Sequence, residues 1–430
     1  MSLLRRLQPG DAAFAEAWRA VCDRGLDSDP ATEAAVREII SEVRTRGDAA
    51  VAEYTERFEG RMPGPTGFEI LRPQLEEAWN RCTPEIRDAL RISADRIRAF
   101  HQEQGATSYS TEQGRLRLRV SPLETVGLYV PGGTALYPSS VLMTAIPAQV
   151  AGVEEIVMVT PGASDQTLAA AHVSGVHRVF EIGGAQAIAA LAYGTEAIPQ
   201  VHKIVGPGNK WVAAAKRLVF GQVDIDSIAG PSEVLVIADT SANPAFVAAD
   251  LLAQAEHDVE ARCILISDSE VLLDAVEAEL ARQLALLPRK NIAGQSLREH
   301  GFAVLVDTLD EALVLSNEYA PEHLELALED ADARVSQVRH AGAIFVGHYT
   351  PEAAGDYSAG PNHVLPTAAA ARYASPLGVY DFLKYTSVLA LRRQDLAALR
   401  EPICALAEVE GLHAHGRSVA IRFETADGDE

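Results

Sequence analysis

The sequence predicts an α/β protein with two Rossmann-like, doubly wound domains, a small N-terminal helical arm and a helical C-terminal tail. Strand-like and helix-like segments alternate from about residue 154 to residue 220, which is typical of a parallel sheet covered by helices on both faces. The same alternation begins again at Val234. A chain of 430 residues is also too long for one ordinary core, which favours two or more domains.

The N-terminal quarter is expected to be helical. Residues 1–24 indicate a short helical arm. The following block, to about Phe100, is polar with apolar residues at helical spacing, which predicts a layer of packing helices. The spacing is clearest at Val36, Ile39, Ile40 and Val43.

Strands and helices then take turns. Residues 115–133 alternate like strands and end in a turn at Pro131–Gly133. Further strands are expected at 154–160, 178–182, 202–206, 234–239, 262–267, 302–307 and 342–347. Helices are expected around 168–173, from Ala185, at about 211–220, around Gln254, at about 271–286 and at 309–319. Residues 353–371 predict a long irregular loop, and the chain returns to helix from about Asp381.

Composition excludes several classes of protein. A hydrophobic content of 48% and a charged content of 23% are those of a soluble globular protein. The net charge of −23 would repel phosphate backbones and anionic membranes, so nucleic-acid and membrane-surface binding are disfavoured. The four cysteines are far apart without CxxC spacing, which argues against a disulfide framework and against a thiolate zinc site. With no signal-peptide core and no apolar run of membrane-spanning length, we expect a cytoplasmic protein.

The segment Asp250 to Asp258 places Gln254 and His257 three residues apart in a helical pattern. Side chains at this spacing lie on one helix face, where an amide oxygen and an imidazole could supply half of a tetrahedral zinc shell. The alternative is a buried histidine hydrogen-bonded to the neighbouring glutamine.

Three glycine-containing loops follow predicted strands, where a doubly wound sheet binds ligands. They are PGG at 131–133, IGGAQ at 182–186 and GPGN at 206–209. Glycines allow the backbone to approach a nucleotide, and a helix that begins after such a loop directs N–H groups at an anion. No complete GxGxxG is present, so plain turns are the alternative.

The sequence APEHLEL at 320–326 places Pro321 at an expected helix N1 position, with Glu322 and His323 in the first turn. The positive potential of a helix start stabilises a carboxylate and disfavours imidazolium, so both groups would be available as bases. An ordinary acidic helix start is the alternative.

Further candidate ligands lie near the C-terminal end. Asp356 and His363 occupy the glycine-rich loop, and Glu410, His413 and His415 cluster beyond it. An aspartate oxygen and a histidine nitrogen would complete the shell begun by Gln254 and His257, although chance also spreads such residues through a long chain.

Taken together, these segments resemble the histidinol dehydrogenase family from about residue 30 to residue 420. The resemblance rests on GLYVPGG, GGAQAIAALAYGT, VGPGNKWV, AGPSEVLVIAD, DLLAQAEH, APEHLE, AGDYSAGPNHVLPT and EGLHAH, which occur in the family order. Departures are small: Asp258 stands where many members have glycine, and Pro361 stands where threonine is usual.

The resemblance implies a site for each component of the reaction. It implies one zinc ion per subunit, held by Gln254, His257, Asp356 and His415. It implies Glu322 and His323 as the catalytic pair. It implies dinucleotide contacts from Tyr129, Gln186 and Asn209. It implies substrate contacts from Ser232, His323, His363, Glu410 and the four zinc ligands.

The resemblance also implies an organisation and an activity. We expect an arm at 1–24, a first α/β domain at 25–127 and 233–378 with the catalytic and metal residues, an NAD-binding domain at 128–232, and a tail at 379–430. The tail would cross to the partner in a homodimer with shared sites. The expected reaction oxidises L-histidinol to L-histidine through L-histidinal with two NAD, the last steps of histidine biosynthesis.

Three other functions remain open from the sequence. The nearest is a paralogous zinc- and NAD-dependent dehydrogenase of another small polar alcohol. A zinc hydrolase in which Glu322 activates water belongs to a different class of enzyme. A third is an acidic binding protein without catalytic activity.

Overall fold

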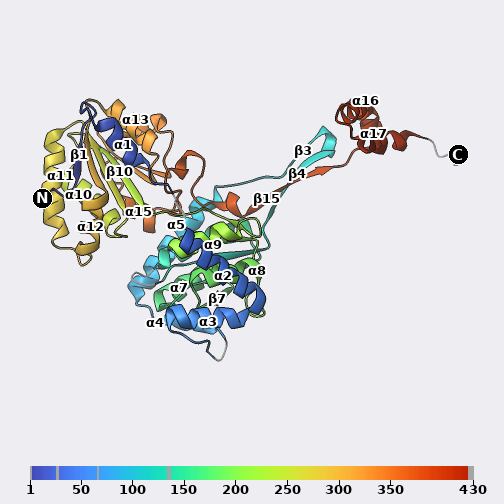
Figure 1. The fold of residues 1–430 in the computed structure, drawn as a ribbon, viewed down its shortest axis with the longest axis horizontal. Coiled ribbons are helices and arrows are strands. Elements are labelled where there is room, and N and C mark those ends of the chain that lie inside the picture. The colour runs from blue at the N-terminus through green and yellow to red at the C-terminus, as the bar shows by residue number, and fades with distance from the viewer. Residues whose placement is uncertain (1, 26–28, 65–66, 133–136, 425–430) are drawn as a thin grey trace. The chain divides into compact units, whose positions relative to one another are not determined.

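The computed structural model describes residues 2–25, 29–64, 67–132 and 137–424 (Figure 1). The chain divides into two compact units. The larger comprises Met1–Gln104 with Leu123–Phe382, and the smaller comprises Gly105–Pro122 with Leu383–Glu430. The predicted fold class is confirmed, because the larger unit contains two six-stranded, predominantly parallel sheets that helices cover on both faces.

The first sheet of the larger unit is parallel throughout. Its order is β1 (Arg5–Leu7), β12 (Gly301–Leu305), β11 (Arg262–Ser267), β10 (Glu233–Ala238), β13 (His323–Ala327) and β14 (Ala343–Val346). The strands expected near 234–239, 262–267, 302–307 and 342–347 are confirmed. Two strands were not expected, since β1 lies in the predicted helical arm and β13 lies where a helix start was predicted.

Helices cover both faces of this sheet because its central strands are apolar on both sides. Val234 and Val236 of β10 pack on one face, and Leu235 and Ile237 pack on the other. The first core includes residues of α10 (Pro244–Ala255), α11 (Glu270–Leu284) and α12 (Lys290–His300). The second includes residues of α1 (Phe14–Cys22), α13 (Leu309–Tyr319) and α14 (Ala331–Arg334).

The second sheet of the larger unit has one antiparallel edge, where β2 pairs with β7. Its order is β2 (Glu69–Ile70), β7 (Arg178–Phe180), β6 (Glu155–Val159), β5 (Thr125–Tyr129), β8 (Lys203–Val205) and β9 (Asp224–Ile225). One face packs on α2 (Pro30–Arg46), α3 (Asp48–Glu59), α8 (Gly184–Tyr193) and α9 (Lys210–Val219). The other packs on α4 (Arg72–Arg81), α5 (Pro84–Gln102), α6 (Pro138–Ala151) and α7 (Asp165–Ser174).

The N-terminal helices differ from their expected place. The sequence analysis grouped residues 25–127 with 233–378, but α2 to α5 pack on the second sheet. The apolar stripe of α2, which contains Val36, Ile40 and Val43, shares a core with Val157 and Val159 of β6. Helical spacing predicts the buried face of a helix but not the sheet that covers it, which explains the difference.

In its described residues, the smaller unit comprises a three-stranded antiparallel sheet and two α-helices. The sheet order is β15 (Leu383–Leu389), β4 (Leu116–Pro122) and β3 (Tyr109–Thr111), and the helices are α16 (Arg393–Val409) and α17 (His413–Ala420). The tail therefore begins with a strand, β15, that was not expected, and becomes helical only after it. Every residue of β15 pairs with a residue of β4, whose alternating sequence predicted a strand.

Short elements complete the chain. These are α15 (Glu352–Tyr357) and the 3-10 turns η1 (Glu112–Gly114), η2 (Val335–Gln337), η3 (Ala370–Arg372), η4 (Val379–Phe382) and η5 (Ile421–Phe423). No helix in the described ranges is long and apolar enough to cross a membrane.

Candidate active site

Glu322 and His323 lie where the chain enters β13, and they are not in a helix. Helix α13 ends at Tyr319, Ala320 adopts a left-handed φ of 54°, and the following strand pairs with β10 and β14. The predicted helix start at Pro321 is therefore wrong. A central strand is stabilised here because hydrogen-bonded neighbours flank it on both sides, which outweighs the local preference of a proline for a helix start.

One residue of the neighbouring strand holds both members of this pair. The backbone N–H of Glu233 donates to Oε2 of Glu322 at 2.8 Å, and the backbone carbonyl of Glu233 lies 2.9 Å from Nδ1 of His323. A carbonyl can only accept, so Nδ1 carries the proton in the neutral ring and Nε2 keeps its lone pair. Nε2 of His323 is buried and has no hydrogen-bond partner among the described residues.

Burial, and not a helix dipole, determines the protonation of the pair. Glu322 is 5% exposed and His323 is 4% exposed. Burial raises the pKa of Glu322 well above its usual value and lowers the pKa of His323 to about 4. His323 is therefore a neutral imidazole at neutral pH. Because its pKa is raised, the carboxylate of Glu322, when ionised, is a stronger base than an exposed glutamate.

A cluster of potential metal ligands forms around the C-terminal end of α10. Ligand atoms of His257, Glu352 and Asp356 all lie within 4.8 Å of one another. His257 follows the end of α10 and is exposed in the single chain, whereas the two carboxylates come from α15. Imidazole nitrogen and carboxylate oxygen are donors that zinc accepts, so these residues fit a divalent ion.

Gln254 lies on α10 beside this cluster and is fully buried. In the amide orientation that satisfies both partners, its nitrogen donates to the two oxygens of Glu352 at 2.8 and 3.2 Å. In that orientation the amide nitrogen, and not the amide oxygen, contacts Glu352. Glu352 was not expected from the sequence, although its position four residues before Asp356 is the spacing that places two carboxylates on one helix face.

His363 and Ser232 lie in loops of the larger unit. Nδ1 of His363 lies 2.9 Å from the carbonyl of Asp356, and its Nε2 lies 3.5 Å from the hydroxyl of Ser140 in α6. Burial lowers the pKa of His363 to about 4, so the ring is neutral at neutral pH. Ser232 immediately precedes β10, and its carbonyl accepts a hydrogen bond from the backbone of Arg262 at 3.0 Å.

Two expected site residues belong to the smaller unit. Glu410 is the C-cap residue of α16, and His415 lies in α17. Both side chains are exposed. Their contribution to a site formed by the larger unit stays a prediction.

The loops expected to bind a dinucleotide follow β5, β7 and β8 of the second sheet. The hydroxyl of Tyr129 accepts a hydrogen bond from the N–H of Gly184 at 3.1 Å, and burial raises the pKa of Tyr129 to about 12. Gln186 is 1% exposed, yet neither its amide oxygen nor its amide nitrogen has a partner in the described part of the chain. A buried amide without partners fits a polar ligand.

Close backbone approach explains two glycines in these loops. A Cβ on Gly132 would lie 2.0 Å from the carbonyl oxygen of Pro161, and a Cβ on Gly206 would lie 2.1 Å from that of Tyr129. Gly133 lies outside the described residues. Asn209 caps α9, with its side-chain oxygen accepting from the backbone of Trp211 at 3.0 Å and of Val212 at 3.2 Å.

The fold and the site define the class of protein. Two doubly wound sheets, glycine loops after the strands of one and a buried carboxylate–imidazole pair in the other are features of a nucleotide-dependent dehydrogenase. The family model described as histidinol dehydrogenase matches residues 23–423. The chain belongs to the histidinol dehydrogenase family and is an NAD-dependent oxidoreductase.

Relatives of known name match almost the whole chain. The histidinol dehydrogenase of Aromatoleum aromaticum is 50% identical over 428 residues, which cover 98% of each chain. That of Chromobacterium violaceum is 51% identical over 427 residues, which cover 97% of this chain and 98% of the relative. The crystal structure of histidinol dehydrogenase from Elizabethkingia anophelis superposes with a TM-score of 0.91 at 34% identity and covers 98% of each chain.

Proposed function

We propose that the protein oxidises L-histidinol to L-histidine through L-histidinal, in two steps that use two NAD, with one zinc ion per subunit. The observation that carries this proposal is the pair of Glu322 and His323, which the backbone of Glu233 holds next to the cluster of potential ligands. Nδ1 of His323 lies 3.8 Å from Oε1 of Glu352 in that cluster. Two successive oxidations need a base that acts twice and a second base that activates water between them. The two buried side chains match these needs.

Zinc would be held by Gln254, His257 and Asp356, with His415 as the fourth ligand. When bound, the ion would hold the imidazole and amino nitrogens of the substrate and so fix the alcohol carbon in position. Glu352 would support this arrangement. Its carboxylate accepts hydrogen bonds from the amide nitrogen of Gln254, so the amide oxygen would be the atom that binds the ion.

His323 would act as the base in both oxidations. Its Nε2 is the free nitrogen, and the low pKa of the ring keeps that nitrogen unprotonated at neutral pH. In the first step, Nε2 takes the hydroxyl proton of the alcohol. At the same time the alcohol carbon transfers a hydride, a hydrogen nucleus with two electrons, to NAD. In the second step, Nε2 takes a hydroxyl proton from the aldehyde hydrate in the same way.

Glu322 would produce that hydrate. In its ionised form, the carboxylate accepts a proton from a water molecule, whose oxygen bonds to the aldehyde carbon while the carbonyl oxygen takes the proton that Nε2 of His323 gained in the first step. Nε2 is then unprotonated again for the second oxidation. The bond from the Glu233 N–H to Oε2 orients the group for this task. Burial of the pair excludes bulk water, which keeps the aldehyde from exchanging with solvent before it is oxidised.

The substrate would be recognised as a cation with an imidazole ring. Glu410 suits its ammonium group, and His363 suits its imidazole side. Tyr129, Gln186 and Asn209 would contact the dinucleotide, and Ser232 would contact the substrate. We further propose a homodimer in the cytoplasm, in which the smaller unit of one chain completes the site of its partner.

The stoichiometry of the reaction tests this proposal. We expect two NADH formed for each histidinol consumed, measured by absorbance together with the amount of histidine produced. One NADH for each histidinol, with the aldehyde as final product, would contradict the four-electron reaction. Turnover of a sulfonated diol but not of histidinol would support the paralogous dehydrogenase. We favour histidinol as the substrate because Glu410 and His363 suit an amine and an imidazole better than a sulfonate.

A further inference from the structure

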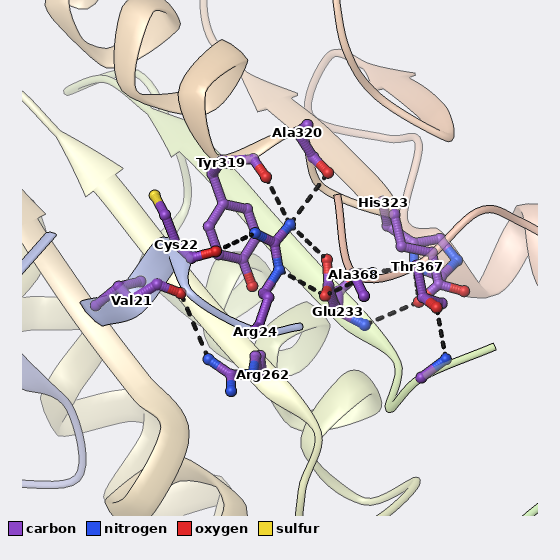
Figure 2. Close-up of polar contacts among 12 residues, drawn as sticks. Val21, Cys22, Arg24, Glu233, Arg262, Tyr319, Ala320, His323, Thr367 and Ala368 are labelled. Carbon is purple, nitrogen blue, oxygen red and sulfur yellow. Dashed lines mark hydrogen bonds and ion pairs between the residues drawn. The ribbon is translucent and has the colours of Figure 1, made fainter. Parts of the chain in front are cut away.

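Arg24 follows α1 and carries a guanidinium that is almost completely buried, with 8% of the residue exposed. Its Nε donates to Oε1 of Glu233 at 2.7 Å, and its Nη2 donates to Oε2 of the same carboxylate at 3.0 Å (Figure 2). The side chain also lies over the ring of Tyr319, with 3.5 Å between its Cζ and the ring centroid. Arg24 therefore has a fixed position as well as a paired charge.

The same guanidinium binds the turn that leads into the catalytic pair. Nη2 of Arg24 donates to the carbonyl of Tyr319 at 2.5 Å and to the carbonyl of Ala320 at 3.1 Å. Tyr319 is the last residue of α13 and stands three residues before Glu322, and Ala320 is the left-handed C-cap of that helix and stands two residues before Glu322. A cation at the C-terminal end of a helix satisfies carbonyls that have no partner within the helix.

Glu233, which pairs with Arg24, also contacts the catalytic pair. Its peptide N–H and carbonyl are the groups that contact Glu322 and His323, and its side-chain Oε1 also accepts from the N–H of Ala368 at 3.1 Å. Arg24 thus holds the residue that orients the pair and, separately, the turn that precedes the pair. Figure 2 shows Arg24 and His323 on either side of Glu233.

Stability alone does not explain a buried pair of this kind. Replacing a buried ion pair by apolar residues of similar volume is often neutral or stabilising, because the desolvation of two charges offsets their attraction. An apolar pair cannot supply directed hydrogen bonds to a carboxylate and to two carbonyls at once. Directed geometry is therefore the property that this arginine adds.

We propose that Arg24 is a positioning residue for catalysis, which fixes Glu322 and His323 through Glu233 and through the turn at Tyr319 and Ala320. This inference rests on the proposed roles of Glu322 and His323. Arg24 itself touches neither substrate nor cofactor. Its loss would displace the base, and a small misplacement of a catalytic group costs on the order of a hundredfold in rate.

Kinetics of Arg24→Met test the proposal in the zinc-loaded, full-length enzyme. We expect kcat for histidinol to fall by about ten- to a hundredfold. KM for histidinol and for NAD should change less than about threefold, because Glu233, Tyr319 and Ala320, which Arg24 contacts, are not themselves proposed contacts of substrate or NAD. The deuterium isotope effect on kcat, measured with histidinol deuterated at the alcohol carbon, should rise because the chemical step becomes slower. A loss of folded enzyme would lower the number of active sites without changing that isotope effect.

Arg178→Met is the matched control. Arg178 makes a similar bidentate pair with Glu69, at 2.7 and 2.8 Å, and also donates to the carbonyl of Ala197 at 3.0 Å. Arg178 and Glu69 lie on β7 and β2 of the second sheet, whereas Glu322 and His323 lie at the start of β13 in the first sheet. We expect its kcat and isotope effect to equal those of the wild type.

If Arg24→Met does not fold, the double variant Arg24→Met, Glu233→Gln removes both buried charges and keeps the peptide groups of residue 233. It should fold and should still show the lowered kcat with the raised isotope effect. A wild-type kcat and isotope effect in either Arg24 variant would overturn the inference. Full activity of Glu322→Gln and His323→Asn would instead overturn the proposed function, so the two failures can be told apart.

Discussion

At the scale of single residues, burial controls how His323 responds to pH. The pKa of His323 falls from 6.5 to about 4 on folding because the ring is removed from water. Above about pH 6.5 the ring is neutral in both the folded and the unfolded chain and contributes nothing to pH dependence. Below that pH the imidazole of His323 binds a proton in the unfolded chain but stays neutral in the folded chain. The free energy of unfolding therefore decreases as the pH falls towards 4.

His323→Asn should remove this loss of stability. Between about pH 7.5 and about pH 5, the unfolding free energy of the wild type should fall relative to that of the variant by about 2 kcal/mol. Urea unfolding of both proteins at the two pH values measures the difference. His202→Asn, at an exposed position, is the control. If the wild type and His323→Asn show the same change with pH, the ring does not have a lowered pKa.

The sequence identified some residues of the candidate site and missed others for a physical reason. Gln254, His257 and Asp356 could be selected because their side chains have the chemistry of metal ligands. Arg24 and Glu233 act through contacts across 209 positions of sequence, and both residue types are common on surfaces. A buried positioning role depends on tertiary neighbours, and residue type and local spacing contain no information about them.

At the scale of elements, β13 shows how a local pattern can mislead. Proline followed by two polar residues is typical of a helix start, whereas residues 323–327 form a strand that pairs with β10 on one side and with β14 on the other. A central parallel strand usually has an apolar sequence, but here Glu325 is buried and its carboxylate accepts from the backbone of Glu352 at 2.8 Å. The polar partner comes from a distant segment, so the strand pattern is visible only in the folded chain.

Gly342→Ala tests whether the position of Glu322 depends on the packing of the segment before β14. A Cβ at residue 342 would lie 2.6 Å from the carbonyl oxygen of Glu322 and 3.2 Å from Cδ of Pro366. The strand entry must then shift, which we expect to cost about 1–3 kcal/mol of stability and to lower kcat. Thermal unfolding and steady-state rates measure the two effects.

The control for this substitution is Gly10→Ala. A Cβ at residue 10 would meet nothing within 4 Å, so its stability and kcat should equal those of the wild type. An unchanged kcat in Gly342→Ala, with folded protein, would show that Glu322 tolerates a displaced backbone.

At the scale of the whole molecule, most strands of the two sheets were predictable because a buried parallel strand has an apolar sequence between turns. The grouping of the helices was not predictable. Helices α2 to α5 pack on the second sheet, and residues 105–122 form a separate unit with the C-terminal segment. The pattern of an amphipathic helix or an alternating strand predicts that one face is buried. Which sheet or strand covers that face is visible only in the folded chain.

The division into two units has a consequence for catalysis. Glu322, His323 and the potential ligands His257, Glu352 and Asp356 belong to the larger unit, while Glu410 and His415 belong to the smaller. If the smaller unit completes the partner's site in a two-fold symmetric dimer, each site combines residues of two chains. Inactive variants with lesions in different units should then complement each other.

We therefore expect activity when Glu322→Gln and His415→Asn subunits are dissociated, mixed in equal amounts and reassociated. Random pairing makes half of the dimers mixed, and each mixed dimer has one site without a substitution, so about a quarter of wild-type activity should return. Glu322→Gln mixed with His323→Asn is the control, because both lesions lie in the same unit and every site keeps one of them. Mixed dimers isolated with two different affinity tags and found inactive would show that each chain uses its own smaller unit.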